Sequence, residues 1–299
     1  MRAIGFSKLN KRNDFEKLVQ YCAKNATERL YTTKNISSSS SDGEEETMLA
    51  VFNKDFARGI GFSICGEYDE QNHFFYDYSF PYIKGEGITS CEDITIERHI
   101  QKESYAGVCD DVKVGVSLIF YLQNIVPYVK AKNSNLLPIK GTTLTLSGLS
   151  CQGTIMMPIM KNENEKRRIR KASVSRNQLI EAARKGDEEA IESLTLEDMD
   201  TYTTISKKIQ QDDVFTLVDT YFMPYGVECD LYSVLGEIEA YEMLTNELTK
   251  EELYRMTITC NELTFDICIN KSDLYGEPEI GRRFKGVIWL QGIINYPNI

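Results

Sequence analysis

The stretch LYRMTITCNELTFDICIN, residues 253–270, decides the fold because apolar and polar residues alternate on both sides of a central turn. If Asn261 and Glu262 form a two-residue hairpin turn, Cys260 pairs with Leu263 and the alternation keeps its phase. One face of the hairpin then carries Tyr254, Met256, Ile258, Cys260, Leu263, Phe265, Ile267 and Ile269. The stretch therefore predicts an antiparallel β-hairpin with one face on a core.

The segments on both sides of this hairpin also alternate. Before it, an inward set alternates with polar residues and Tyr232, up to an expected bulge at Gly236. This set is Val227, Cys229, Leu231 and Leu235. After it, the run GRRFKGVIWLQGIIN, residues 281–295, has one face formed by Phe284, Ile288, Leu290 and Ile294. Four or five antiparallel strands in this order predict a small β-barrel or a strongly bent sheet.

The first half of the chain predicts a mostly antiparallel sheet with one N-terminal helix. The helix is expected from a cap at Asn13 or Asp14 to about Leu30. GIGFSIC and NHFFYDYSF then predict a hairpin that places His73 beside its tip. Further alternating or apolar runs cover 94–100, 112–122, 142–150 and 153–159. The fold class expected for the whole chain is α+β.

The middle of the chain suggests where the domains divide. The run KNENEKRRIRKASVSR, residues 161–176, is basic and interrupts the strand pattern, which is typical of a solvated linker. A capping box at Ser175 and Gln178 starts a helix that Gly186 ends, and Thr195 suggests a later start. The expected division is an N-terminal α+β domain at 1–160, a basic linker at 161–175 and a C-terminal domain at 176–299. The last comprises helices within 176–210 and a barrel-like part within 212–296.

Composition limits the function classes. With 299 residues, 42% hydrophobic and 26% charged, the chain has the composition of a soluble globular protein. Its net charge of −11 disfavours a nucleic-acid partner or an anionic membrane surface. The start carries no signal-peptide pattern, and the longest apolar stretch, 114–129, is too short to span a bilayer. Eight scattered cysteines without paired spacing indicate reduced, buried thiols, and we expect a cytoplasmic protein.

Several long segments resemble one bacterial family that is known only as a domain of unknown function. These are the opening MRAIGFSK, the run LTLEDMDTYTTISKKIQQDDVFTLVDTYFMPYGVECDLYSVLGEI and the segment EIGRRFKGVIWLQG. The resemblance covers essentially the whole chain and implies a bacterial cytoplasmic protein of about this length. It implies no reaction, cofactor or site residue.

One group of residues could carry chemistry, although no catalytic residue and no metal site is assigned. The candidates are Glu97, His99, Cys109, Asp110 and Asp111. If 94–100 is a strand, Glu97 and His99 share one face, as an orienting carboxylate and a base require. Metal binding is one alternative and Cys-His catalysis another, but the two aspartates beside Cys109 would raise the pKa of its thiol. The alternative without chemistry is a surface His-Glu pair and a buried cysteine.

A second group, Arg282, Arg283, Lys285 and Trp289, is a candidate for binding a ligand or a partner. With Phe284 inward, the side chain of Trp289, the only tryptophan, points out of the barrel core beside cations. Such a face suits an anionic ligand or a protein partner. Alternatively, it docks on the N-terminal sheet.

These observations lead to one hypothesis and two alternatives. The leading hypothesis is a non-enzymatic binding or regulatory protein that engages a small anionic ligand or a protein partner. The first alternative is a metal-dependent or Cys/His hydrolase that uses the Glu97 group. The second is weak single-stranded nucleic-acid binding by the C-terminal barrel, assisted by the basic segment 166–171. The sequence identifies no cofactor.

Overall fold

The computed structural model describes residues 1–35, 46–98, 104–111, 117–159, 163–208, 218–227 and 229–297. The N-terminal part comprises η1 (Arg2–Ile4), α1 (Arg12–Lys24), β1 (Glu28–Asn35), β2 (Glu46–Ala57), β3 (Ile60–Tyr68) and β4 (Phe74–Ile83). The central part comprises β5 (Ile94–Arg98), β6 (Tyr105–Cys109), β7 (Leu118–Leu122), α2 (Ile125–Asn133), β8 (Thr143–Met156), α3 (Glu163–Arg184) and α4 (Glu188–Lys208). The C-terminal part comprises β9 (Tyr221–Pro224), β10 (Leu231–Thr245), β11 (Glu252–Cys260), β12 (Leu263–Asn270), η2 (Lys271–Asp273), β13 (Leu274–Tyr275) and β14 (Arg283–Asn295). The fold class is α+β, as expected.

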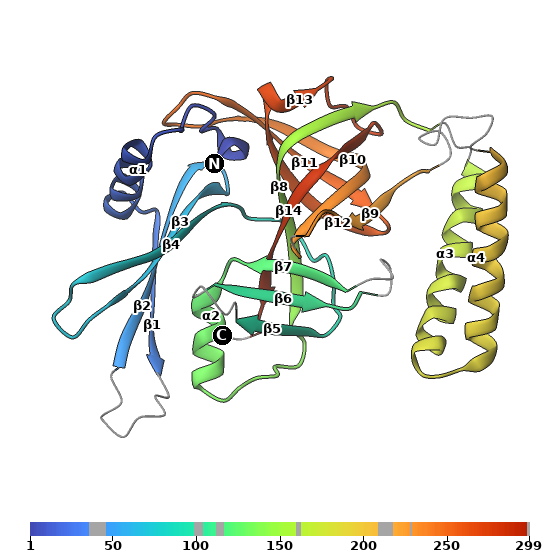
Figure 1. Ribbon diagram of the computed structural model, residues 1–299, viewed down its shortest axis with the longest axis horizontal. Coiled ribbons are helices and arrows are strands. Elements are labelled where there is room, and N and C mark those ends of the chain that lie inside the picture. The colour runs from blue at the N-terminus through green and yellow to red at the C-terminus, as the bar shows by residue number, and fades with distance from the viewer. Residues whose placement is uncertain are drawn as a thin grey trace.

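The N-terminal sheet has the strand order β1-β2-β3-β4 and is antiparallel throughout. Helix α1 lies against β2 and β3 (Figure 1). The helix ends at Lys24, and Leu30, where it was expected to end, lies in β1. The predicted β3–β4 hairpin is present with His73 exposed at its tip, where the His73 ring contacts Asp69. Most of the polar tract at 36–46 lies outside the described residues.

Five strands close into a barrel in the order β8-β12-β11-β10-β14, because β14 pairs back to β8. The β8–β12 pairing is parallel and the other four are antiparallel. The turn predicted at Asn261 and Glu262 is confirmed, since both have positive φ and Cys260 pairs with Leu263. All eight residues expected on the inner face are buried in one core cluster. The predicted inner face of β14 is buried there as well.

The predicted phase of β10 was wrong. Tyr232 and Val234 are the buried core residues, whereas Leu231 is only half-buried. The strand begins at Leu231, so Val227 and Cys229 precede it and are exposed. The phenol oxygen of Tyr232 accepts a hydrogen bond from the Ile119 amide, which satisfies its polar end inside the core. The irregularity in the β10–β11 pairing lies between Ile238 and Ala240 rather than at Gly236.

The large sheet continues beyond the barrel. The far half of β14 pairs in parallel with β7, and β6 and β5 follow in that order. Helix α2, which the sequence did not predict, follows β7 directly and contacts β1 and β2 (Figure 1). Pro127 occupies its first turn, where the missing proline N–H removes no helical hydrogen bond.

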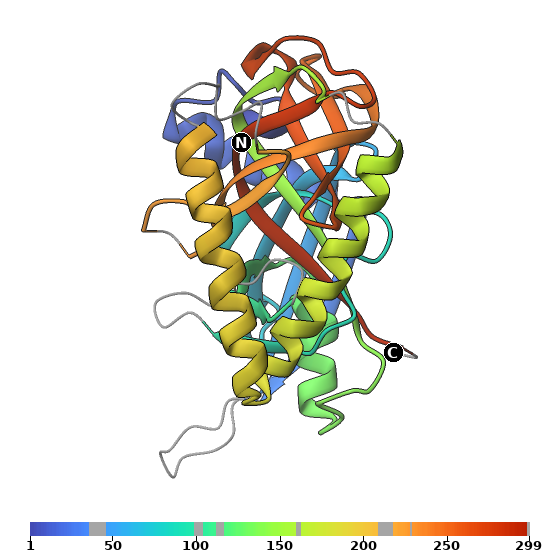
Figure 2. The ribbon, with the colours of Figure 1, turned by 90° about the vertical axis from the view of Figure 1, so that its right-hand side faces the viewer.

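Helices α3 and α4 form an antiparallel helical hairpin that stands at one side of the body (Figures 1 and 2). Most of the linker expected at 161–175 is helical, because α3 begins at Glu163 rather than after Ser175. The break at Gly186 is confirmed, with a positive φ of 89°. No new helix starts at Thr195, since α4 is continuous.

The barrel and the N-terminal sheet are joined by buried polar contacts. Gln123 Nε2 donates to Gln291 Oε1 at 2.8 Å, and Gln291 Nε2 donates to the Pro81 carbonyl at 2.8 Å. On the outer side of the barrel, Arg255 and Asp266 form a buried ion pair at 2.7 Å. Because β8 precedes residue 160 yet completes the barrel, the expected division at 160 separates β8 from its partners β12 and β14.

All eight cysteines are free thiols. Five are buried, but Cys91, Cys151 and Cys229 are exposed, so the expectation of burial was wrong for these three. Among the described residues, no helix combines the length and apolar character needed to cross a bilayer.

Candidate functional site

A pocket with a volume of about 310 Å³ lies beside β5, at the end of the large sheet. Four elements form it: β5, α2, the segment between α2 and β8, and the end of β14. Its lining residues are Ile94, Thr95, Ile96, Tyr128, Leu137, Pro138, Ile139, Thr142, Ile294 and Tyr296. A cavity of this size accommodates one large side chain or a small molecule.

Side-chain hydrogen bonds hold the pocket's walls together. The Asn124 amide, at the start of α2, pairs with the backbone of Ile294: Nδ2 donates to the carbonyl at 2.8 Å and Oδ1 accepts from the amide at 3.1 Å. These two hydrogen bonds fix the start of α2 to the end of β14. Thr142 Oγ1 donates to the Ile139 carbonyl at 2.8 Å and shapes the opposite wall.

The chemistry of the pocket is apolar with two phenol groups. Burial raises the pKa of Tyr296 and of Tyr128, so both hydroxyls remain protonated at neutral pH. Tyr128 also packs edge-on against Tyr105, with ring centroids 5.3 Å apart. None of the lining residues is charged. The pocket therefore suits an apolar group with a polar end rather than a bare anion.

The pocket adjoins the edge of β5. Three consecutive residues, Ile94, Thr95 and Ile96, line it, although neighbouring side chains of a strand point to opposite faces. The strand therefore presents its edge to the cavity. In the described part of the chain, β6 is the only strand that pairs with β5. Such an edge carries backbone donors and acceptors that can bind another strand.

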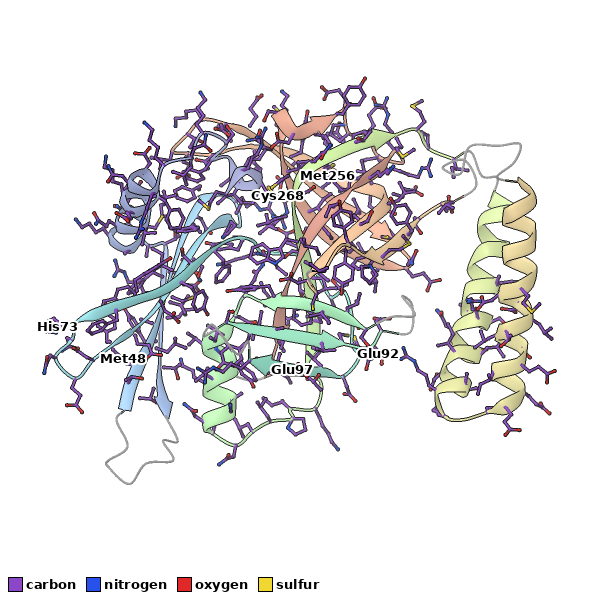
Figure 3. The ribbon with its side chains drawn as sticks, in the orientation of Figure 1. Met48, His73, Glu92, Glu97, Met256 and Cys268 are labelled. Atoms are coloured by element: carbon purple, nitrogen blue, oxygen red, sulfur yellow. The ribbon has the colours of Figure 1, made fainter. Side chains whose placement is uncertain are left out.

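The candidate group around Glu97 is not brought together in the described part of the chain. Cys109 pairs with Ile94, and directly paired residues point to the same face of a sheet. Glu97 lies three positions after Ile94, so its side chain points to the other face, about 10 Å farther along the strand. Figure 3 shows Glu97 on β5, with its side chain exposed. His99 lies outside the described residues.

Cys109 and Asp111 lie together in the interior, on either side of Ser90. Ser90 Oγ donates to Asp111 Oδ2 at 2.6 Å, and Cys109 Sγ contacts Ser90 Oγ at 3.7 Å. Burial raises the pKa of the Cys109 thiol to about 11, so the thiol is protonated at neutral pH. Asp110 is exposed and accepts a hydrogen bond from Ser117. This arrangement keeps Cys109 a protonated, buried thiol rather than an activated nucleophile.

The cations of the second candidate group bond within the chain. Arg283 is buried, and its guanidinium donates to the carbonyls of Met157 and Val218 at 3.1 and 2.9 Å. Arg282 donates to the Glu277 carbonyl and pairs with Glu279 at 2.8 Å. Lys285 is half-buried on the same strand. Burial lowers the pKa of Arg283, although the carbonyl oxygens that accept its hydrogen bonds stabilise its positive charge.

Trp289 lies between the two core clusters of the protein. Its ring packs against Tyr121 with centroids 5.0 Å apart, and it touches both the barrel cluster and the cluster under α1. Its Nε1 donates to Asp230 Oδ2 at 2.6 Å. The side chain thus points out of the barrel interior, as the alternation predicts, and packs toward the N-terminal sheet. A role of this group in binding remains a prediction.

Sequence reasoning missed the pocket, because its ten lining residues come from four separated segments and share no motif. The apolar run at 114–129 signalled burial but not the helix that supplies Tyr128. Within the residues that the structure describes, no three His, Cys, Asp or Glu side chains are grouped to hold a metal ion.

The comparison with protein families identifies the chain. A model of the domain of unknown function DUF3881, described from an E. rectale gene, matches residues 1–292. The chain belongs to this family. The resemblance inferred from its opening and closing segments is therefore confirmed, and DUF3881 carries no assigned activity. Searches of curated proteins and of solved structures found no match.

Proposed function

We propose that this member of DUF3881 is a non-enzymatic binding protein whose pocket beside β5 receives an apolar side chain from an extended segment of a protein partner. One observation carries the proposal: a cavity of about 310 Å³ with apolar walls adjoins a strand that pairs on one side only in the described chain. A peptide laid along β5 would add a strand to the sheet through backbone hydrogen bonds. Its alternate side chains would provide specificity through the pocket.

The pocket favours a protein segment over a small anionic ligand. Its lining residues carry no cation, and an ionised group without a partner is costly to bury. The arginines that the sequence suggested for an anion, Arg282 and Arg283, already donate to carbonyls of the chain. An extended peptide fits both features of the site, because its apolar side chain can enter the pocket and its backbone amides can pair with the edge of β5.

The expected affinity is moderate. Burying one side chain of the size of leucine contributes about 1.5–3 kcal/mol, and pairing with a short strand adds several hydrogen bonds of about 1 kcal/mol each. After the cost of ordering the peptide, a dissociation constant in the micromolar range is expected.

The hydrolase alternative receives no support from the site geometry. Glu97 and Cys109 point to opposite faces of the β5–β6 pair, and burial raises the pKa of the Cys109 thiol. For the nucleic-acid alternative, the basic segment 166–171 lies in α3, in the helical hairpin rather than in the barrel. Both alternatives remain hypotheses without a supporting contact.

A peptide selection tests the proposal. The full chain is used to select from displayed random peptides of about ten residues, which is long enough to cover β5. Enriched peptides are then titrated by fluorescence anisotropy against the wild type, Leu137→Glu and Leu136→Glu. Leu137 lines the pocket and its side chain is partly exposed, whereas its neighbour Leu136 is exposed and lies outside the pocket.

The two variants separate the pocket from the surrounding surface. We expect selected peptides to share one apolar anchor and to bind Leu137→Glu at least tenfold more weakly, with Leu136→Glu unchanged, because only the first puts a carboxylate into the cavity. Failure to enrich any peptide, or equal loss in both variants, rejects the proposal.

We further infer a cytoplasmic location, because eight free thiols favour a reducing compartment. Cell fractionation with an antibody to the chain tests this, and recovery in a secreted or envelope fraction would contradict it.

A further inference from the structure

Among the described residues, the helical hairpin of α3 and α4 makes few contacts with the rest of the molecule. Arg184 Nη1 donates to the Asp110 carbonyl at 3.3 Å, and Asn177 Nδ2 reaches Glu262 Oε2 at 3.5 Å. Within the hairpin, Arg176 bridges to Asp198 at 2.7 Å. Figure 1 shows the two helices on one flank of the body, and Figure 2 shows that they meet at the tip of the hairpin and diverge toward its other end. Helices of this length usually gain their stability by packing an apolar face on a partner.

Several apolar residues on this hairpin are exposed. Ile191 and Leu196 on α4 are 48% and 58% exposed, and Val174 on α3 is 51% exposed. At about 100° per residue, the side chains of Ile191, Leu196 and Met199 spread over about 140° of the circumference of α4, with Met199 between the other two. Val174 and Met199 also lie near the midpoints of their helices, α3 running over 163–184 and α4 over 188–208. The apolar surface is thus centred on the length of the hairpin.

The charges of the hairpin are divided between its two ends. By sequence, the end nearest the barrel carries five lysines and arginines at 166–171 and two more at 207–208. The middle and the tip are acidic, with three cations against seven carboxylates between residues 172 and 199. Two such hairpins laid side by side in opposite directions would place each basic end on an acidic end.

We propose that the helical hairpin is the dimerisation element of the protein, and that its occupant is the hairpin of a second copy in antiparallel orientation, forming a four-helix bundle. A two-fold axis at right angles to the hairpin must pass through its midpoint, which is where Val174 and Met199 lie. The same operation matches opposite charges at both ends. Both the apolar and the charged pattern are therefore self-complementary.

The area is sufficient for a stable dimer. A 22-residue helix is about 33 Å long and roughly 10 Å across. One side of each of the two helices then offers together about 650 Å², so two copies bury roughly 1,300 Å², within the range of specific interfaces.

Sedimentation velocity of the full chain between about 1 and 200 µM tests the proposal. We expect the wild type to dimerise and the double variant Ile191→Glu with Leu196→Glu to weaken dimerisation at least tenfold, because it puts charges into the exposed apolar surface of α4. Tyr275→Glu with Ile280→Glu is the matched control, since both residues are highly exposed in other parts of the surface. A wild type that stays monomeric, or dimers equally stable in both double variants, overturns the proposal.

Cross-linking tests the orientation even where the charged variant loses helix content. In a chain with Cys91, Cys151 and Cys229 replaced by serine, Met199→Cys lies one residue from the midpoint of α4, so its two copies would lie about 3 Å apart along the helix axis. Ser193→Cys lies five residues from the midpoint, about 15 Å from its copy, which is beyond the reach of a disulfide. Oxidation should link only the first variant. Linkage of neither, or of both to the same extent, contradicts the antiparallel dimer.

Discussion

The carbonyl oxygens of Met157 and Val218, at the two ends of the helical insertion, both accept hydrogen bonds from the guanidinium of Arg283. One buried side chain thus holds together the point where the chain leaves the barrel after β8 and the point where it returns before β9. The two oxygens lie no more than about 8 Å apart, since each is within hydrogen-bond distance of the same planar group.

This relationship predicts that the insertion can be removed. A chain in which about six glycine and serine residues replace 160–217 should fold, because a linker of that length spans more than the gap. We expect the midpoint of urea unfolding to stay close to that of the full chain, measured by far-UV circular dichroism. A shortened chain that is unfolded in buffer would show that the hairpin is required for the barrel.

Replacing Arg283 itself should be costly. Arg283→Met leaves the Met157 and Val218 carbonyls without this donor, and a buried unsatisfied group costs about 1–3 kcal/mol. The free energy of unfolding in urea should fall by about 2–4 kcal/mol, while the half-exposed neighbour Lys285→Met should change it by less than about 1 kcal/mol. Equal stability of the two variants would argue against Arg283 as a structural clamp.

Trp289 should contribute through packing and one hydrogen bond. Trp289→Phe keeps an aromatic ring beside Tyr121 but removes the donor to Asp230, so we expect a loss of about 1–2 kcal/mol in unfolding free energy. Trp289→Ala should lose about 3–5 kcal/mol, because it also opens a cavity between the two clusters. Asp230→Asn retains an acceptor oxygen and serves as the mild control. If Trp289→Ala were as stable as the wild type, the ring would be a surface group available for binding.

The thiols should divide into two classes by reactivity. Titration of the native protein with a disulfide reagent should consume three thiols, those of Cys91, Cys151 and Cys229, and all eight should react in denaturant. Cys109 should remain unmodified in the native state, because it is buried and burial raises the pKa of its thiol to about 11. Mass spectrometry of peptides after brief alkylation identifies the sites. Rapid labelling of Cys109 would revive the catalytic hypothesis.

Stability should decline in alkaline solution. Burial raises the pKa of Cys65 and of Cys260 to about 12, whereas an unfolded thiol titrates near about 8.5. The folded state holds these protons more tightly, so their contribution is complete below about pH 8.5 and is lost progressively as the pH rises toward 12. The expected loss is on the order of 1 kcal/mol per thiol for each pH unit.

Urea unfolding between about pH 7.5 and 10.5 measures this slope. Cys260→Ala should make the decline shallower, while Cys151→Ala, at an exposed position, should leave it as it is. A stability that rises with pH in this window would contradict the assignment of these thiols as protonated in the fold.

The sequence predicted those strands of the barrel in which apolar and polar residues alternate regularly. Residues 253–270 and the inner face of β14 follow from their patterns, because each places large aliphatic residues at every second position. In β10 the pattern failed because Tyr232, with its hydroxyl satisfied by Ile119, occupies a core position that the reasoning gave to Leu231. Local sequence also does not say which strands pair when they lie far apart in the chain, so the closure of the barrel by β8 was not foreseen.

The pocket lay beyond sequence reasoning for a related reason. Thr95, Tyr128 and Ile294 are apolar or neutral residues of ordinary type, and only the folded chain brings them together. The charged residues that sequence reasoning favoured, such as Arg283, proved to bond to carbonyls of their own chain. Charged residues such as Arg283 thus support the fold, and neutral residues that share no motif form the cavity.

The pairing of β8 with β12 and β14 has a consequence for biosynthesis. A ribosome must translate about 130 residues after β8 before β14 exists to close the barrel. Until then, the apolar inner face of β8 is not covered by the complete barrel. Such late, long-distance pairing makes folding slow and leaves nascent chains prone to association. Truncated products that lack the final strand should therefore be recognised by chaperones and degraded rather than accumulate as folded fragments.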